Sequence, residues 1–399
     1  MTQEPKIFPY IEHLLQGAEV VWKPLGEVAS LKRGRVISKE YLYDNVGEYP
    51  VYSSQTVNNG EIGRIKTFDF EQEAITWTTD GANAGTVFYR EGCFSITNVC
   101  GLVTIKNIQT LNYKYLYYWL SIEAKKHVYS GMGNPKLMSN QMEKIQIPLP
   151  PLSVQQEIVR ILDKFTQLEA ELEAELDCRK RQYEYYRNKL LTFNEIGGGT
   201  EIVWKTLGEV GTFIRGNGLQ KKDLITSGVP AIHYGQIYTY YGISAEQTIS
   251  FVSPETAEGL RKVDYGDVII TNTSENIDDV GKAVAYCVKE QGVTGGHATI
   301  FKPSEKIIGK YLVYYTQTTE FSNQKRKYAK GTKVIDISAN DLTKITIPLP
   351  PLSEQQRIAN ILDKFDTLVN SISEGLPKEI ALRRKQYEYY REKLLSFPS

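Results

Sequence analysis

The chain alternates between two patterns of apolar positions. After Leu152, and again after Leu352, apolar residues recur at steps of three and four over about 40 positions, which is typical of a coiled-coil helix about 60 Å long. Before each stretch come short β-branched runs broken by Gly and Asn, such as residues 74–80 and 267–274. The pattern therefore predicts two strand-rich globular parts, each followed by a long helix.

Proline and glycine mark where the helices begin and break. Pro150 and Pro151 favour extended backbone just before Leu152. The pairs Ser153 with Gln156 and Ser353 with Gln356 predict capping boxes at the two helix starts. The first helix has an apolar seam that resets after Leu172 with a stutter. In the second helix, Gly375 and Pro377 predict a break or a kink.

The chain contains an internal repeat. The segment 144–165, KIQIPLPPLSVQQEIVRILDKF, recurs at 344–365 as KITIPLPPLSEQQRIANILDKF, with 17 of 22 positions identical. QYEYYR recurs at Gln182 and Gln386, and WK-x-LGEV recurs at Trp22 and Trp204. Identity nearly vanishes between the tryptophan and the IPLPPL strings. The repeat predicts a constant frame with two divergent inserts, in which the two helices pack against each other antiparallel.

Composition and charge exclude several classes of protein. The 399 residues carry 47 Lys+Arg and 47 Asp+Glu, and hydrophobic residues make up 41%, so the chain is neither disordered nor basic overall. No apolar run reaches the roughly 18 residues of a membrane span, and the N-terminus lacks the apolar core of a secretory signal. We expect a cytoplasmic protein that makes no membrane contact.

The motifs of catalysis and of cofactor binding are absent from the sequence. The four cysteines and four histidines are scattered without the spacing of a zinc site or a disulfide framework. GTFIRGN at 211–217 lacks the lysine of a phosphate loop, and LPPL at 149–152 lacks the polar and aromatic residues of a methyltransferase tetrapeptide. There is no GxSxG elbow. We therefore predict no catalytic residue, no metal and no cofactor.

The duplicated strings closely resemble those of the specificity (S) subunits of type I restriction-modification systems. The resemblance rests on IPLPPLSxQQxI at Ile147 and Ile347, QYEYYRxKLL at Gln182 and Gln386, and the WKxLGEV openings, and it covers essentially the whole chain. It implies an α+β chain with an internal pseudo-two-fold repeat. Two mixed α/β, strand-rich target recognition domains would be separated by two long antiparallel coiled-coil helices.

On this basis we predict six segments. They are an N-terminal segment (1–21), the first target recognition domain (22–147), the first spacer helix (148–193), a linker (194–203), the second target recognition domain (204–347) and the second spacer helix (348–399).

The resemblance also implies a function without catalysis. Each recognition domain would recognise one half of a bipartite, asymmetric double-stranded DNA site. Two modification (methyltransferase) subunits, and restriction subunits for cleavage, would dock around the chain. Half-sites one duplex turn apart, about 34–36 Å, present the same groove face, which a long rod can match. In some relatives, four-residue repeats like LEAELEAEL near Leu168 set the spacer; alternatively, Glu and Ala here simply form exposed helix.

Short basic stretches are the candidate DNA contacts, because Lys and Arg can bind phosphates and base edges. Two stretches are expected as loops after the last helix of each insert, and two follow the tryptophan strings. Solvated lysines at helix ends are the alternative interpretation. The candidate residues are Lys32, Arg33, Arg35, Lys125, Lys126, Lys136, Arg215, Lys221, Lys222, Lys325, Arg326, Lys327, Lys330 and Lys333.

Two other functions remain open at this stage. The chain could be a coiled-coil interaction scaffold with two protein-binding domains and no DNA recognition. It could also be a transferase or nuclease without recognisable motifs, which would require activity from the purified chain alone. The tyrosine-rich stretches beginning at Lys114 and Lys310 are predicted to be core helices rather than base-stacking surfaces.

Overall fold

The computed structural model describes residues 8–130, 133–193 and 202–397. It divides into two compact units, Met1–Glu173 with Ile380–Ser399, and Ala174–Glu379. Each unit contains one of the globular domains and parts of the long helices. Most of the predicted linker, residues 194–201, and residues 1–7 of the predicted N-terminal segment lie outside the described residues. The six boundaries proposed from the sequence stay predictions.

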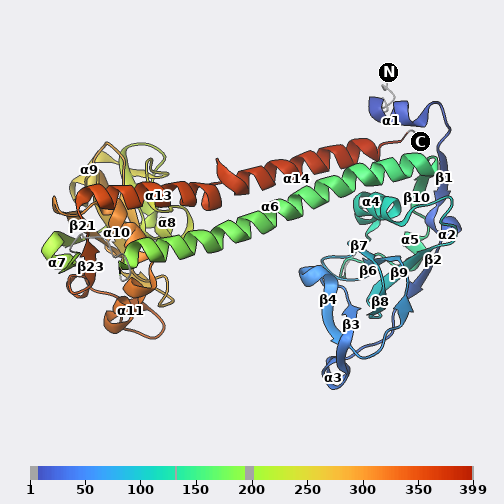
Figure 1. The fold of residues 1–399 in the computed structure, drawn as a ribbon, viewed down its shortest axis with the longest axis horizontal. Helices are drawn as coiled ribbons and strands as arrows, with labels where there is room; N and C mark the ends of the chain where they lie inside the picture. The colour runs from blue at the N-terminus through green and yellow to red at the C-terminus, as the bar shows by residue number, and fades with distance from the viewer. Residues whose placement is uncertain (1–7, 131–132, 194–201, 398–399) are drawn as a thin grey trace. The chain divides into compact units, whose positions relative to one another are not determined.

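The globular domain of the first unit is built on two four-stranded sheets (Figure 1). One has the order β2 (Ala29–Arg33), β9 (Cys100–Ile105), β6 (Ala74–Thr78) and β7 (Val87–Arg90). The other has the order β4 (Glu61–Ile65), β3 (Val46–Tyr52), β8 (Cys93–Ile96) and β5 (Phe70–Glu71). All five residues of β6 are buried, as expected of a central strand covered on both faces.

The globular domain of the second unit has a closely similar topology. Its larger sheet runs β12 (Gly211–Arg215), β21 (Ala298–Pro303), β17 (Val268–Thr271), β19 (Ala283–Tyr286) and β14 (Ser244–Ala245). Its second sheet runs β15 (Phe251–Val252), β13 (Val229–Ile232), β20 (Gly292–Thr294) and β16 (Arg261–Val263). The order β12-β21-β17-β19 repeats β2-β9-β6-β7, so the two inserts share a strand plan although their sequences have diverged.

The tryptophan and IPLPPL strings pair with each other in both units. β1 (Val21–Pro24) pairs antiparallel with β10 (Gln146–Leu149), and Trp22 lies opposite Pro148. β11 (Val203–Thr206) pairs with β23 (Thr346–Leu349) in the same register, with Trp204 opposite Pro348. Each globular domain is therefore closed by a two-stranded ribbon made from its first and last residues.

The structure confirms the predicted break in the second long helix but not the predicted capping boxes. The first is a single helix, α6 (Leu152–Thr192), and the second is broken into α13 (Leu352–Asn370) and α14 (Gly375–Leu394). At the break, Gly375 has a φ of +71°, a left-handed conformation that glycine adopts without a steric penalty. The capping boxes were wrong, because the helices begin at Leu152 and Leu352, and Pro351 caps α13 without a side-chain hydrogen bond.

Aromatic pairs join the helices within each unit. In the first unit Phe165 stacks on Tyr390 with ring centroids 5.4 Å apart. In the second unit Tyr183 and Tyr186 stack on Phe365 at 6.2 Å and 5.7 Å. Leu168, in the stretch of α6 between these pairs, is 36% exposed.

The tyrosine-rich helices are core helices, as predicted. Tyr115 in α4 (Tyr113–Glu123), and Tyr311 and Tyr314 in α10 (Gly309–Thr316), have no exposed surface. The Tyr115 hydroxyl donates to the Pro148 carbonyl at 3.0 Å, and the Tyr311 hydroxyl donates to the Pro348 carbonyl at 2.9 Å. These bonds satisfy buried hydroxyls and tie each helix to the ribbon at its domain's base.

A buried glutamine attaches each long helix to its domain. The Gln155 amide accepts from the Asn112 amide N–H and donates to the Thr110 and Pro150 carbonyls, each at 2.9 Å. Gln355 makes the same three bonds, accepting from the Ile308 N–H and donating to the Lys306 and Pro350 carbonyls at 2.9 Å.

About two turns further along each helix, an aspartate adds a second attachment. Asp163 accepts from Lys114 at 2.6 Å and from the Tyr118 hydroxyl at 2.7 Å. Asp363 accepts from Lys310 at 3.2 Å and from the Tyr314 hydroxyl at 2.7 Å. The repeated helix sequence thus contributes the same attachments to both globular domains.

Candidate nucleic-acid interface

The structure gives Arg33 and Arg215 equivalent positions. Each is the last residue of its strand, β2 or β12, and each is followed by a glycine. The Arg33 guanidinium donates to the Asn98 carbonyl at 2.6 Å, and that of Arg215 donates to the Gly296 carbonyl at 3.2 Å. Arg33 also donates to the Thr79 hydroxyl at 2.8 Å. Both guanidinium groups are therefore held beside the loops that precede β9 and β21.

The other basic residues of these two stretches differ in whether their side chains have a partner within the protein. Arg35 forms an ion pair with Asp69 at 2.9 Å and lies over the Tyr41 ring at 5.1 Å. Lys32, at the end of β2, and Lys221 and Lys222, in the 3-10 turn η3 (Lys221–Asp223), are exposed. Among the described residues these three lysines have no side-chain hydrogen bond or ion pair.

The first domain's later basic residues lie on a short turn and in a backbone pairing with Tyr129. Lys125 and Lys126 fall in the 3-10 turn η2 (Ala124–His127) rather than in a loop, and Lys126 pairs with Glu123 at 2.7 Å. Lys136 is exposed, and its backbone exchanges hydrogen bonds with Tyr129 at 2.9 and 3.0 Å. The next residue, Leu137, bonds to the Thr79 carbonyl, so Lys136 is held next to the loop after β6.

In the second domain the basic cluster divides into a helical part and a loop part. Lys325, Arg326 and Lys327 lie in α11 (Thr319–Tyr328), so the prediction that they lie in a loop was wrong. Lys325 is only 4% exposed, and its ammonium donates to the Asp278 carbonyl at 2.8 Å. Burial lowers the pKa of this ammonium. Arg326 forms an ion pair with the Asp278 carboxylate at 2.5 Å.

Lys330 and Lys333 form the free part of the cluster. Both are exposed, and neither side chain has a hydrogen bond or an ion pair among the described residues. The backbone of Lys330 pairs with Asp336, and Ile337 bonds to the Asn272 carbonyl. This repeats the arrangement of Tyr129, Lys136 and Leu137 in the first domain. The two basic loops therefore lie at the same edge of equivalent sheets.

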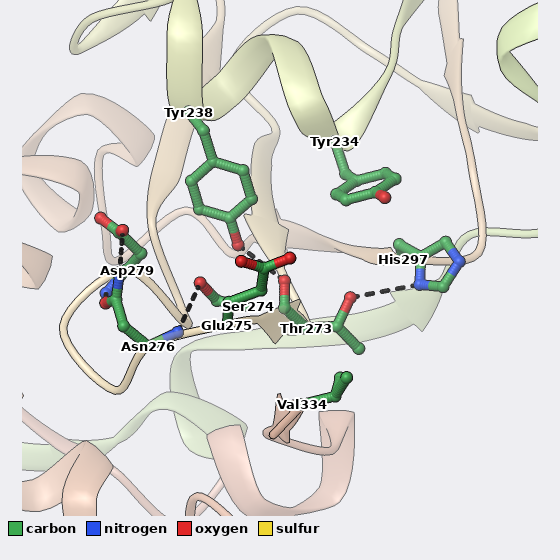
Figure 2. A pocket seen from close by; sticks show the side chains of 9 residues that line it. All are labelled: Tyr234, Tyr238, Thr273, Ser274, Glu275, Asn276, Asp279, His297 and Val334. Atoms are coloured by element: carbon green, nitrogen blue, oxygen red, sulfur yellow. Dashed lines mark hydrogen bonds between the residues drawn. The ribbon is translucent and has the colours of Figure 1, made fainter. Parts of the chain in front are cut away.

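A pocket in the second domain was not foreseen from the sequence (Figure 2). It has a volume of about 490 Å³ and lies between α8 (Tyr234–Thr239) and the loop that follows β17. Its lining residues are Tyr234, Tyr238, Thr273, Ser274, Glu275, Asn276, Asp279, His297 and Val334. Because Val334 follows Lys333 in the chain, the pocket lies beside the free part of the basic cluster.

Aromatic rings and hydrogen bonds fix the walls of this pocket. Tyr234 lies between two imidazoles, with ring centroids 4.5 Å from His233 and 4.8 Å from His297. The Tyr238 hydroxyl donates to the Thr273 carbonyl at 2.8 Å, and His297 Nδ1 lies 3.2 Å from the Thr273 hydroxyl oxygen. Burial lowers the pKa of His233, and the neighbouring His297 adds to the effect. No sequence motif marked these residues, since they come from separate segments of the chain.

The described residues show few features of other site chemistries. They contain no group of three or more His, Cys, Asp or Glu that could hold a metal ion, and the four cysteines are free. No described helix is both long enough and apolar enough to cross a bilayer. What the two domains share is a set of exposed basic side chains near equivalent strand ends.

Comparison with known proteins defines the family. The model of the type I restriction modification DNA specificity domain matches twice, at residues 18–177 and 201–382, and the chain belongs to this family. The specificity subunit of the Escherichia coli type I restriction enzyme EcoR124I/EcoR124II is 34% identical over 98% of this chain and 97% of its own length. A putative type I restriction enzyme specificity subunit from Haemophilus influenzae is 32% identical over 97% of this chain and 98% of its own.

Solved structures share the fold. The S subunit from M. genitalium aligns with a TM-score of 0.58 at 16% identity, covering 96% of this chain and 98% of its own. A chain from a study of type I restriction-modification complex assembly and conformational transition aligns with a TM-score of 0.63, also at 16% identity, covering 96% of this chain and 99% of its own. The predicted family, fold class and noncatalytic role as a DNA specificity subunit are confirmed.

Proposed function

We propose that each recognition domain binds one half of a bipartite, asymmetric DNA site through its basic loop edge. The observation that carries this proposal is the repeated placement of exposed basic side chains around equivalent strand ends, Arg33 in the first domain and Arg215 in the second. The two domains share a strand order but have different loop sequences, as expected if they bind half-sites of different sequence. Lys325 leaves the set of proposed contacts, because its buried ammonium is already bonded to Asp278.

The remaining candidates fall into two groups by their freedom to move onto DNA. Exposed lysines without an ion pair can neutralise phosphates at little cost, whereas paired groups must first exchange a partner. The first group contains Lys32, Lys125, Lys136, Lys221, Lys222, Lys327, Lys330 and Lys333. The second contains Arg33, Arg35, Lys126, Arg215 and Arg326.

The helices have a separate proposed role as spacer and docking platform. Two modification subunits would bind the duplicated helical frame, one to each copy, and restriction subunits would join for cleavage. The internal duplication supports the number two, because equal surfaces bind equal partners. We expect this assembly in the cytoplasm, where it meets DNA.

Electrophoretic mobility shift of the chain assembled with its modification partner tests the DNA proposal. The site is found first by mapping methylated adenines in the host genome, which gives both half-sites and their spacing. We expect tight, salt-sensitive binding to duplexes carrying the mapped site. Equal affinity for duplexes with either half-site scrambled would contradict the proposal. Partner binding without any DNA footprint would favour the interaction scaffold, which the family membership does not support.

A further inference from the structure

The loop after β17 carries an acidic insertion beside the free lysines, Lys330 and Lys333. Thr78 and Thr271 hold equivalent places, opposite Cys100 and Ala298, and Gly85 and Gly281 bond back to them in the same way. Ten residues separate the second pair but only seven separate the first, since 281 − 271 = 10 and 85 − 78 = 7. The loop of the second domain is thus three residues longer, and it carries Glu275, Asp278 and Asp279.

Two of these three acids have partners within the protein. Asp278 is held by α11, through the Arg326 ion pair at 2.5 Å and the Lys325 bond to its carbonyl. Asp279 accepts from the Asn276 side chain at 2.5 Å, and its own N–H donates to Asn276 at 2.8 Å. Part of the basic cluster therefore positions the acidic loop.

Glu275 has no such partner. Its side chain is exposed, lines the pocket, and has no hydrogen bond or ion pair among the described residues. Figure 2 shows it among the side chains of Tyr234, Tyr238 and Thr273. On a surface that binds phosphates, an unpaired carboxylate opposes binding unless it meets a hydrogen-bond donor.

DNA offers that donor in the major groove. Cytosine N4 and adenine N6 carry amino groups there, whereas guanine O6 and N7 and thymine O4 are acceptors that repel a carboxylate. Resting on the proposed function, we propose that Glu275 is a specificity-determining residue that accepts a hydrogen bond from a cytosine or adenine amino group in the second half-site. The bonds of Asp278 and Asp279 hold the loop in place, so the backbone of Glu275 is positioned beside the tyrosine wall before DNA arrives.

Methylation mapping with matched variants tests this assignment. Cells carry the native chain, Glu275→Gln, Glu275→Ala or Glu305→Gln, each with its modification subunits. Glu305 is an exposed carboxylate in the same domain, placed beside the β23 ribbon and outside the pocket. We expect the two Glu275 variants to relax the requirement for cytosine or adenine at one position of one half-site, leaving the other half-site unchanged. Glu305→Gln should keep the native motif.

Binding to purified duplexes completes the test if a variant no longer methylates. Co-purification with the modification subunits shows that the variant is folded and assembled. Loss of the carboxylate should reduce affinity for the native site roughly ten- to a hundredfold, with the loss confined to duplexes bearing one particular base. A native motif kept by both Glu275 variants, or an equal affinity loss for every duplex, would overturn the assignment while leaving the proposed function intact. Failure of the native chain to give a bipartite motif would instead refute the proposed function.

Discussion

Arg384 of α14 forms an ion pair with Glu169 of α6 at 2.5 Å, within the first unit. The same guanidinium reaches Glu173, also at 2.5 Å. The two glutamates occupy the same position in successive units of the repeat LEAELEAE, so one arginine joins both repeat units to the facing helix. Phe165 precedes Glu169 in α6, whereas Tyr390 follows Arg384 in α14. Because Phe165 and Tyr390 stack on each other, the two helices run antiparallel here.

This arginine should contribute modestly to stability. Because its side chain is 54% exposed, we expect Arg384→Ala to lower the free energy of unfolding by about 0.5–1 kcal/mol, with the difference shrinking at high salt. Denaturant unfolding in a double-mutant cycle with Glu169→Ala measures the coupling. Lys385→Ala, an exposed neighbour, is the control, and equal effects of the two substitutions would argue against the pairing.

The buried glutamines should matter far more. Gln155→Ala leaves the Asn112 N–H and two carbonyls without their partner, so we expect a loss of about 2–4 kcal/mol in the free energy of unfolding. Gln355→Ala should behave alike in the second unit. The adjacent exposed Gln156→Ala should change stability by no more than about 0.5 kcal/mol. Denaturant midpoints compare the three, and a Gln155→Ala value as small as the control would refute the attachment.

Removing the free lysines should weaken DNA binding without unfolding the domain. For the double variant Lys330→Ala, Lys333→Ala, we expect weaker binding and a slope of log affinity against log salt that is smaller by about 2, since each phosphate contact contributes about 0.9. The slope is measured by fluorescence anisotropy.

A matched pair of lysines serves as the control for that experiment. Lys289 and Lys306 are exposed, and Lys289 follows the end of β19, which lies beside the start of β17 and so at the opposite sheet edge. Replacing these two by alanine should leave the slope unchanged. An unaltered slope in the Lys330, Lys333 variant would remove that loop from the interface.

Acid should weaken the start of the second domain. Hydrogen bonds from Lys205, then from the Thr206 backbone and hydroxyl, lower the pKa of Glu209 to about 2. Because the folded-state pKa lies below the unfolded value, the stabilisation is present above about pH 4.5 and is lost as the pH falls towards 2.

Carboxyl chemical shifts measured by NMR across this range check the value. Thr206→Val removes the hydroxyl bond and should raise the pKa of Glu209, while Lys23→Ala in the first domain should not change it. The first domain has Pro24 where Thr206 stands, so its LGEV turn lacks the N–H and hydroxyl that Thr206 supplies. A Glu209 pKa near 4.5 in the native chain would contradict the bonding.

Residue spacing and glycine positions in the sequence predicted much of the helical part of the fold. Heptad spacing located α6, Gly375 located the break, and tyrosine periodicity located the core face of α10. The capping prediction failed because Ser153 and Ser353 lie inside the helices, while Gln155 and Gln355 turn inwards to bond the domains. That choice depends on backbone groups more than 40 residues away, which spacing along one helix does not reveal.

The candidate interface was only partly predictable for a similar reason. The run of basic residues in the sequence located the cluster at 325–333 but predicted that Lys325 and Lys330 would both contact DNA. Tertiary contact separates them, because Lys325 is buried against the loop of Asp278 whereas Lys330 remains exposed. The pocket at Glu275 combines residues from four segments, and no local pattern marks such a meeting.

The glutamine attachments bear on how such a chain can change over time. Gln155 bonds to the backbone of Thr110 and Asn112, and Gln355 bonds to the same backbone atoms of Lys306 and Ile308. The side chains at these positions differ completely, yet the bonds are the same. Because each glutamine bonds to main-chain atoms, substitutions at these domain positions leave this attachment intact. New sequence preferences can therefore arise by mutation without rebuilding the scaffold that carries them.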